Sequence, residues 1–359
     1  MKNMPKKILQ CIFNTHKKNE MAIHDLKFLF WECTHRCNLN CLHCGSDCTS
    51  DNTVKDMPFD DFYKAILPIK EKYDPKNITV AIIGGEPLVR DDLAYCGNEL
   101  QKLGFNWGIV TNGYNYTPDI HNSLIEAGMG TITLSLDGFK SSHNWLRSNE
   151  HSFDRASTAL RLITTTPNLI YDIVTCVNKK NIHELNELKE YLIEEKVIAW
   201  RLFAISPIGR AAHNNELTLD SNQLRKLMDF IVNTRKEKRM KTNFGCDAYL
   251  GKYELEVRDS FSFCRAGINV ASIFVDGSIS ACPNINRNFA QGNIYNDLFL
   301  DVWDNRFKIM RDRRWTKTGL CHDCKDYRNC NGGALHLWNE KKDSIMTCIH
   351  KKLCDYVNN

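Results

Sequence analysis

The sequence has no long apolar segment. No stretch approaches the roughly 18 consecutive apolar residues that a transmembrane helix requires, and the apolar run near the N-terminus is too short and too interrupted for a signal peptide. The chain also lacks the dense basic stripe of nucleic-acid-binding proteins, because its net charge of +4 is spread along its length. These absences predict a cytoplasmic protein that binds neither a membrane nor a nucleic acid.

Cysteine, in contrast, is abundant, with 16 residues in a chain of 359. A chain of this length can bury a full core without disulfides, and the reducing cytoplasm favours metal binding or catalysis by clustered cysteines. Cys11, Cys96 and Cys176 stand alone in apolar or helical surroundings, which indicates plain buried thiols. Most of the others fall into two groups, one near the N-terminus and one in the last third of the chain.

Short β-rich runs alternate with amphipathic stretches between residues 27 and 210. This alternation is typical of β-α-β units and predicts a parallel sheet. We expect strands at residues 28–31, 78–83, 107–111, 131–136, 171–177 and 199–205, with helices at 59–72, 91–103, 118–127, 153–164, 183–195 and 219–236. Six strands are too few for a closed eight-stranded barrel. A partial barrel or an open sheet is therefore expected, with the functional site at the C-terminal strand ends.

The N-terminal cysteine group contains a motif that predicts a metal site. Cys37, Cys41 and Cys44 give the spacing C-x3-C-x2-C within "THRCNLNCLHCGSDC". Three thiolates on one tight loop can hold three irons of a [4Fe–4S] cluster and leave the fourth iron open to an outside ligand. Zinc is the alternative, because this spacing also suits zinc. Its fourth ligand would come from Cys33, Cys48, His35 or His43.

The next predicted strand ends in Gly84-Gly85-Glu86-Pro87, where paired glycines allow the backbone to approach a ligand closely and Glu86 could bind an amino group. Together with the cysteine loop, this segment resembles the radical S-adenosylmethionine (radical SAM) enzymes. The likeness continues through "VTNG" (110–113), "SLDG" (135–138), "HNWLRSNEHSFDRA" (143–156) and "RLFAISPIGRA" (201–211).

This resemblance implies that the three cysteines are catalytic and hold a [4Fe–4S] cluster, whose open iron is chelated by the amino and carboxylate groups of SAM. The Gly-Gly-Glu segment would bind the amino group, Ser135 the ribose or the carboxylate, and Arg147 or Arg155 the carboxylate. The full set of cofactor-binding residues implied is His43, which would lie near the adenine, Gly84, Gly85, Glu86, Asn112, Ser135, Arg147 and Arg155. Electron transfer to SAM would give a 5′-deoxyadenosyl radical that abstracts hydrogen from a substrate.

The pattern becomes irregular from about residue 242, and half of the cysteines lie beyond that point. Their spacing resembles the SPASM extension of radical SAM enzymes that modify peptides and proteins. That extension has the pattern C-x(9–15)-G-x4-C, then C-x2-C-x5-C-x3-C, then a last cysteine. The resemblance implies one complete auxiliary [4Fe–4S] cluster on Cys321, Cys324, Cys330 and Cys348. Zinc is the alternative for these cysteines.

One position departs from the SPASM pattern. Ala334 stands where the family has a cysteine, so the nearer auxiliary cluster would have only three cysteine ligands, Cys246, Cys264 and Cys282. Its open iron would bind a substrate thiolate or another outside ligand. Alternatively, Cys354 or His336 fills the gap, or this cluster is lost. We favour an under-ligated cluster because the three other cysteines are present.

The predicted fold is α/β, a partial (β/α)6 barrel of radical SAM type with a small C-terminal iron–sulfur (SPASM) domain. We expect an N-terminal extension (1–26), a radical SAM core (27–240) and a SPASM domain (241–359). The cofactors would be SAM, its [4Fe–4S] cluster and one or two auxiliary clusters. The partners would be a peptide or protein substrate and an electron donor such as flavodoxin or ferredoxin.

The resemblance implies an oxygen-sensitive oxidoreductase that matures a ribosomal peptide by a thioether or carbon–carbon crosslink or by epimerisation. Formylglycine formation on a sulfatase is an alternative. In such relatives an aspartate follows the cysteine of the G-x4-C step, whereas this chain has Pro283 there. A non-catalytic, metal-stabilised binding protein is the alternative outside enzymology, and the presence of all three N-terminal motif cysteines argues against it.

Overall fold

A sheet of ten strands forms the centre of the computed structural model, which describes residues 5–51, 53–245, 249–339 and 344–354. Its order is β10-β9-β8-β1-β2-β3-β4-β5-β6-β7. The strands are β1 (Phe28–Glu32), β2 (Thr79–Ile83), β3 (Asn106–Thr111), β4 (Thr131–Ser135), β5 (Ile170–Val177), β6 (Ala199–Ala204), β7 (Lys241–Phe244), β8 (Val270–Ile273), β9 (Ser278–Ser280) and β10 (Gly292–Asn293).

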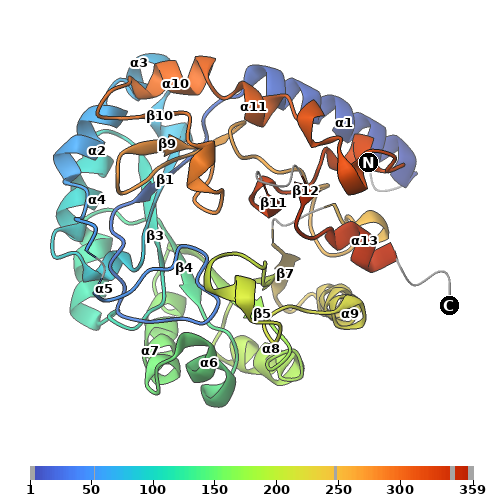
Figure 1. Ribbon diagram of the computed structural model, residues 1–359. Helices are drawn as coiled ribbons and strands as arrows, with labels where there is room; N and C mark the ends of the chain where they lie inside the picture. Colours follow the sequence, from blue (N-terminus) through green and yellow to red (C-terminus); the bar gives the residue numbers. More distant parts are fainter. Residues whose placement is uncertain (1–4, 52, 246–248, 340–343, 355–359) are drawn as a thin grey trace.

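Strands β1 to β7 are parallel and follow chain order, so the predicted parallel α/β sheet is confirmed. The sheet is curved, and helices lie along its outer side (Figure 1). They are α2 (Phe59–Ile66), α3 (Ile69–Lys72), α4 (Leu93–Lys102), α5 (Pro118–Glu126), α6 (Lys140–Arg147), α7 (Ser152–Thr164), α8 (Leu185–Glu194) and α9 (Ser221–Glu237). β7 extends the six predicted strands by one short member.

Two local predictions were incomplete. The helix expected over 59–72 is interrupted at Pro68, which lacks an N–H and clashes with the preceding turn, so that α2 and α3 are separate. The short helix α6, which carries Arg147, was not predicted, and neither was α1 (Lys6–Ile23). Within the described part of the chain, no helix combines the length and the apolar character that crossing a membrane requires.

The C-terminal region is joined to the core through the sheet. β8 pairs in parallel with β1, matching Phe28 with Val270 and Trp31 with Ile273, and β9 and β10 continue the sheet antiparallel. A single cluster of buried apolar side chains runs from Leu26 to Leu353. The predicted boundary at residue 240 therefore divides a continuous sheet and a continuous core, and it remains a prediction about domain organisation.

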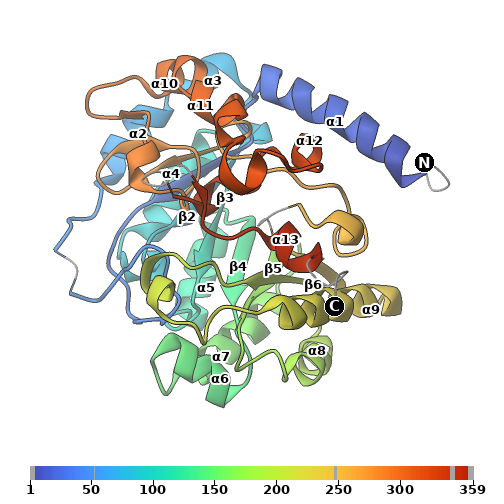
Figure 2. The same cartoon turned by 45° about the vertical axis from the view of Figure 1, so that its right-hand side comes forward.

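The rest of the C-terminal region consists of short elements. They are α10 (Phe299–Asn305), α11 (Lys308–Arg311), α12 (Tyr327–Cys330), α13 (Ile349–Cys354) and the two-stranded sheet of β11 (Trp338–Asn339) and β12 (Ser344–Ile345). The N-terminal helix α1 lies beside this region, next to α12 (Figure 2).

Candidate active site

A cavity of about 350 Å³ lies at the C-terminal ends of the parallel strands. The loop after β1, the turn after β2 and the ends of β3 to β6 contribute to its walls, since parallel strands end on one edge of the sheet. Its lining includes Cys37, Cys41, His43, Cys44, Gly84, Gly85, Glu86, Asn112, Ser135 and Arg147. These are the predicted motif cysteines and every predicted cofactor-binding residue except Arg155.

The three motif cysteines lie together on the loop after β1, where they form a small cluster with Leu39, Cys48 and Tyr114. Burial raises the pKa of the Cys37 thiol to about 12. A hydrogen bond from Cys48 lowers the pKa of Cys44 to about 5. Asn112 Nδ2 lies 3.9 Å from Cys37 Sγ and Arg147 Nη1 lies 3.8 Å from Cys41 Sγ. Three converging sulfurs with cationic and amide donors beside them suit a negatively charged thiolate–metal cluster.

The four residues considered as a fourth zinc ligand differ in whether they line the cavity. Cys33 is fully buried in the apolar core, and His35 pairs with Glu32 at 3.2 Å, so neither lines the cavity. Cys48 and His43 do line it. The geometry alone therefore reduces the four candidates to two.

Arg210, in the "RLFAISPIGRA" segment, fixes the conformation of the cysteine loop. Its side chain donates to Cys41 O at 2.7 Å and to Cys48 O at 3.1 Å, and its backbone N–H donates to Cys44 O at 3.0 Å. Gly209 packs so closely that a Cβ there would lie 2.3 Å from Cys44 O. The loop after β6 thus supports the loop after β1 through main-chain contacts.

The paired glycines after β2 also serve this close packing. A Cβ on Gly84 would lie 2.4 Å from Thr34 O, and one on Gly85 would lie 2.2 Å from Arg36 O. The sequence analysis explained these glycines by a close approach of the backbone to a ligand, which is only part of their function. Both glycines line the cavity, but it is the cysteine loop that leaves no room for their side chains.

Glu86 is only 1% exposed, and its carboxylate connects two strand ends. Oε1 accepts hydrogen bonds from Leu88 N–H at 3.1 Å and Thr111 Oγ1 at 2.7 Å, while Oε2 accepts one from Asn112 N–H at 2.8 Å. Burial nevertheless raises its pKa to about 7. Since Glu86 also borders the cavity, a cationic group bound there would favour its ionised form.

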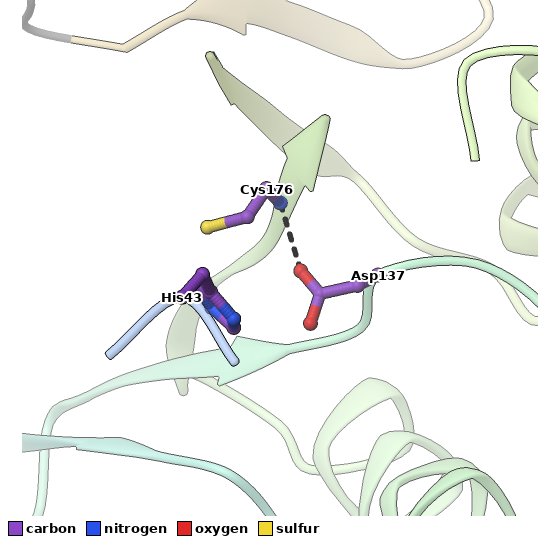
Figure 3. Close-up of side chains that lie close together, drawn as sticks. All are labelled: His43, Asp137 and Cys176. Atoms are coloured by element: carbon purple, nitrogen blue, oxygen red, sulfur yellow. Dashed lines mark hydrogen bonds between the residues drawn. The ribbon is translucent and has the colours of Figure 1, made fainter. Parts of the chain in front are cut away.

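A second group of polar side chains meets at the cavity, which two of its three members, His43 and Cys176, line. Donor atoms of His43, Asp137 and Cys176 lie within 4.8 Å of one another, and the Cys176 N–H donates to Asp137 at 2.8 Å (Figure 3). Arg147 Nε donates to the other Asp137 oxygen at 2.6 Å. Because a buried guanidinium already neutralises Asp137, we interpret this group as a polar wall rather than a cation site.

The electrostatics of that wall are set by burial. Burial raises the pKa of Asp137, but Arg147, the nearby His43 and His143 and the Cys176 N–H together outweigh burial and hold the pKa below its ordinary value. Burial lowers the pKa of His43 to about 4, so its imidazole is neutral at pH 7. His43 Nδ1 is buried with no hydrogen-bond partner among the described residues, which leaves it available to a bound molecule.

The remaining predicted residues differ in position. Asn112 is buried and donates to Asn38 at 2.8 Å, and Ser135 is half-buried at the end of β4. Arg155 is exposed on α7, with its guanidinium over the Tyr114 ring at 5.7 Å. Of the two arginines that the sequence left open, Arg147 is the one that lines the cavity.

Two further cysteine groups lie in the C-terminal region. The first, called the central cysteine pair, is Cys264 and Cys282, which are close enough to interact electrostatically. Main-chain N–H groups of Leu335 and Ala266 donate to Cys264, and that of Asn284 donates to Cys282. Cys246 lies outside the described residues. Ala334 is 2% exposed, directly precedes the Leu335 whose N–H donates to Cys264, and offers no ligand atom.

The second group, called the C-terminal cysteine set, is Cys321, Cys324, Cys330 and Cys348. Each of Cys321, Cys330 and Cys348 has its pKa raised by burial and by neighbouring thiols of the same set. Four thiols that come from separate short elements therefore converge on one point, which fits a four-thiolate cluster. Cys354, a predicted alternative ligand, is exposed on α13 and contacts His350 at 3.7 Å.

Sequence reasoning did not assign a role in the cavity to Asp137, Arg210 or Cys176. Asp137 was visible only as part of "SLDG", Arg210 as part of a longer segment, and Cys176 was interpreted as a plain buried thiol although it is half-buried and lines the cavity. His336, which the sequence analysis named as a possible fourth ligand of the nearer auxiliary cluster, acts electrostatically on Cys264 and borders both this cavity and a second one next to it. No local spacing marks these residues, because they meet the cysteine loop only through the fold.

Two protein-family models match the chain. Residues 31–192 match the radical SAM superfamily, and residues 264–325 match the SPASM iron–sulfur cluster-binding domain. The chain is a radical SAM enzyme with a SPASM domain. The predicted family is thereby confirmed, and its cofactors are SAM, the SAM-binding [4Fe–4S] cluster and auxiliary clusters of the SPASM region.

Relatives of this radical SAM/SPASM chain differ in activity. It is 24% identical over 345 residues to an AdoMet-dependent heme synthase of Methanosarcina barkeri, covering 90% of this chain and 97% of the relative. It is 28% identical over 311 residues to mycofactocin maturase MftC of Mycolicibacterium smegmatis, covering 86% and 77%. SuiB of Streptococcus suis bound to S-adenosylmethionine has a similar fold, with a TM-score of 0.69, 18% identity and coverage of 97% and 84%.

Proposed function

We propose that the enzyme modifies a peptide or protein side chain, as a maturase of a ribosomal peptide. Cys37, Cys41 and Cys44 would hold the cluster that binds SAM, and the family's chemistry when both are bound is reductive cleavage of SAM to a 5′-deoxyadenosyl radical that abstracts hydrogen. Relatives support the peptide assignment, since MftC is named a maturase and a SuiB structure contains the precursor peptide SuiA.

The site for SAM would be the 350 Å³ cavity. Glu86 would face the amino group, Arg147 the carboxylate, and the unpartnered Nδ1 of His43 a polar atom of the adenosine. Gly84, Gly85, Asn112 and Ser135 complete this proposed set, whereas the exposed Arg155 would act only through Tyr114. Apolar residues on the opposite wall, such as Phe203, Ile205 and Ile208, would exclude water from the reacting atoms.

The substrate would enter a second cavity, of about 530 Å³, which shares Gly45, Ile208, Asn284 and His336 with the first. Its other walls carry apolar and aromatic side chains, including Phe274 and Trp338. Because the two cavities adjoin at these shared lining residues, a side chain of a peptide bound in the second cavity would reach the SAM cavity. This continuity between the two cavities is the observation that carries the proposal for a substrate larger than SAM itself.

Pro283, which directly follows Cys282, lines the second cavity. Its side chain has no atom that could accept a proton. Formylglycine formation in the manner of the sulfatase-maturing relatives, with a base at this position, is therefore not favoured. A second candidate function is modification of a tetrapyrrole. The relative supporting it is the heme synthase, which this chain matches over 97% of that relative's length.

The test is anaerobic incubation of reconstituted enzyme with SAM, dithionite and either peptides encoded beside the gene or an iron porphyrin carrying propionate groups. Deoxyadenosine and a mass change of the peptide are expected with the wild-type chain. A chain with Cys37→Ala, Cys41→Ala and Cys44→Ala should form neither product, while Cys96→Ala, which changes a buried thiol outside the cavity, should form both. Turnover of the porphyrin alone would replace the peptide proposal with the second candidate.

A further inference from the structure

The N-terminal helix α1 lies outside both matched domains, yet it contacts residues that flank Cys264 and Cys330, one cysteine of each group in the C-terminal region. Phe13 packs on the rings of Phe261 and Phe263, just before Cys264, with centroids 5.4 and 5.8 Å away. Asn14 donates to Asn329 Oδ1 at 3.0 Å, beside Cys330. Figure 2 shows α1 running alongside α12. The helix thus covers the loops that carry the auxiliary-cluster ligands.

One side chain of this helix is unusual. Lys17 is 3% exposed, and its ammonium donates to Arg328 O at 3.2 Å, Asn329 O at 3.0 Å and Asn331 Oδ1 at 2.6 Å. These acceptors surround Cys330 in sequence and are all uncharged. Among the residues that the structure describes, no carboxylate pairs with Lys17. Two cationic groups, Arg313 and Lys18, act on Lys17 electrostatically and lower its pKa further.

A buried ammonium without a counter-ion is costly, because desolvation is not repaid by an opposite charge. Burial lowers the pKa of Lys17 to about 8, so the group still carries its charge at pH 7. A four-thiolate [4Fe–4S] cluster is an anion whose negative charge increases on reduction. Such a cluster on the C-terminal cysteine set would supply the charge that the protein does not.

We propose that Lys17 is the internal counter-ion of the cluster held by the C-terminal cysteine set, and that it raises the reduction potential of that cluster. The inference rests on the proposed assignment of these cysteines as ligands. Stabilising the reduced state makes the cluster a better acceptor for the electron that a substrate radical loses. Lys17 is a positioning residue in this account, because it acts on the cluster and does not touch the substrate.

The test is a redox titration of the auxiliary clusters, followed by electron paramagnetic resonance. It uses full-length reconstituted chain with Cys37→Ala, Cys41→Ala and Cys44→Ala, so that the SAM-binding cluster does not contribute. Lys17→Met should lower the midpoint of one cluster by the equivalent of a tenfold change in the oxidised-to-reduced ratio, about 59 mV for one electron. Lys17→Arg, which keeps the charge, and Lys18→Met, which removes an exposed charge, should leave it unchanged.

If Lys17→Met does not retain the iron of the wild-type chain, Lys17→Gln replaces it, since a neutral amide still donates two hydrogen bonds to the same acceptors. The proposal would be overturned if the wild-type chain and the neutral variants had the same midpoint potential. It would also be overturned if Lys17→Arg shifted the midpoint potential as much as the neutral variants do. Absence of any auxiliary signal in the wild-type background would instead overturn the ligand assignment. The titration involves no SAM or peptide, so its outcome is independent of the substrate proposal.

Discussion

At the scale of single residues, burial decides the chemical state of the groups around the cavity. Glu86 and Asp137 are both almost fully buried carboxyl groups, yet their pKa values move in opposite directions. Burial dominates for Glu86, whose protein donors are neutral N–H and O–H groups. Burial also raises the pKa of Asp137, but the Arg147 guanidinium, two neighbouring histidines and the Cys176 N–H together lower it by more. The first carboxyl therefore titrates near neutral pH, and the second stays ionised.

Glu86 predicts a pH dependence for SAM binding. Its pKa of about 7 means that it becomes neutral as the pH falls through 7, so it attracts the SAM ammonium less. We expect the affinity to be about fivefold lower at pH 6 than at pH 7, because the ionised fraction of a carboxyl group with this pKa falls by that factor. Isothermal titration calorimetry with SAM at a series of pH values measures this affinity. Glu86→Gln should abolish the acidic limb, and an unchanged limb would contradict the assignment.

Arg147 predicts a large effect on stability. Replacing it with methionine leaves the Asp137 carboxylate buried without its cationic partner, which costs about 3–5 kcal/mol of unfolding free energy. The double variant Asp137→Asn with Arg147→Met should recover part of this loss, because no uncompensated charge remains. Urea denaturation of the iron-free chains measures both. Simple additivity of the two single variants would show that the residues act independently.

At the scale of elements, loops from different β-α units form one structure around the cysteine loop. The turn after β2 and the loop after β6 both touch its main chain at distances that exclude a side chain. The three motif cysteines are close in sequence, but their conformation depends on these two distant segments. The cluster loop is therefore rigid only in the context of the completed sheet.

Gly209 tests this dependence. Its φ is +54°, and an added Cβ would lie 2.3 Å from Cys44 O. Gly209→Ala should displace the cysteine loop. It should therefore lower the iron content of the reconstituted protein, although all auxiliary cysteines are still present. Gly104→Ala is the matched control, since φ there is +90° but the nearest atom to a Cβ is 3.6 Å away, leaving only a conformational cost of about 1–2 kcal/mol. Equal iron content in the two variants, assayed colorimetrically, would refute the role of this contact.

At the scale of the whole molecule, the N-terminal and C-terminal regions share one sheet and one core. β8 pairs with β1, and the buried apolar cluster includes residues of both matched domains. Separate folding of the two regions would leave the edge of β1 without its partner and expose a large apolar surface. The two family models thus match separate parts of the sequence, whereas in the structure these parts share one hydrophobic core.

A truncation checks this point. A chain ending at residue 240 should be insoluble or lack a cooperative unfolding transition, because it loses β8 and the apolar residues that cover β1. A chain ending at Cys354 should unfold in one transition like the full-length protein. Circular dichroism and tryptophan fluorescence during heating measure the transitions. A monomeric, cooperatively unfolding 240-residue fragment would support the predicted boundary instead.

The sequence by itself determined the α/β class, the parallel order of the main strands, the family and the cysteine motifs. These depend on local spacing and hydrophobic periodicity, which a chain carries whatever its neighbours are. Only the tertiary structure decided that Arg147 rather than Arg155 lines the cavity, that Arg210 and Gly209 support the cysteine loop, and that Lys17 lies buried beside Cys330. Such contacts join residues up to some three hundred positions apart, so no local pattern encodes them.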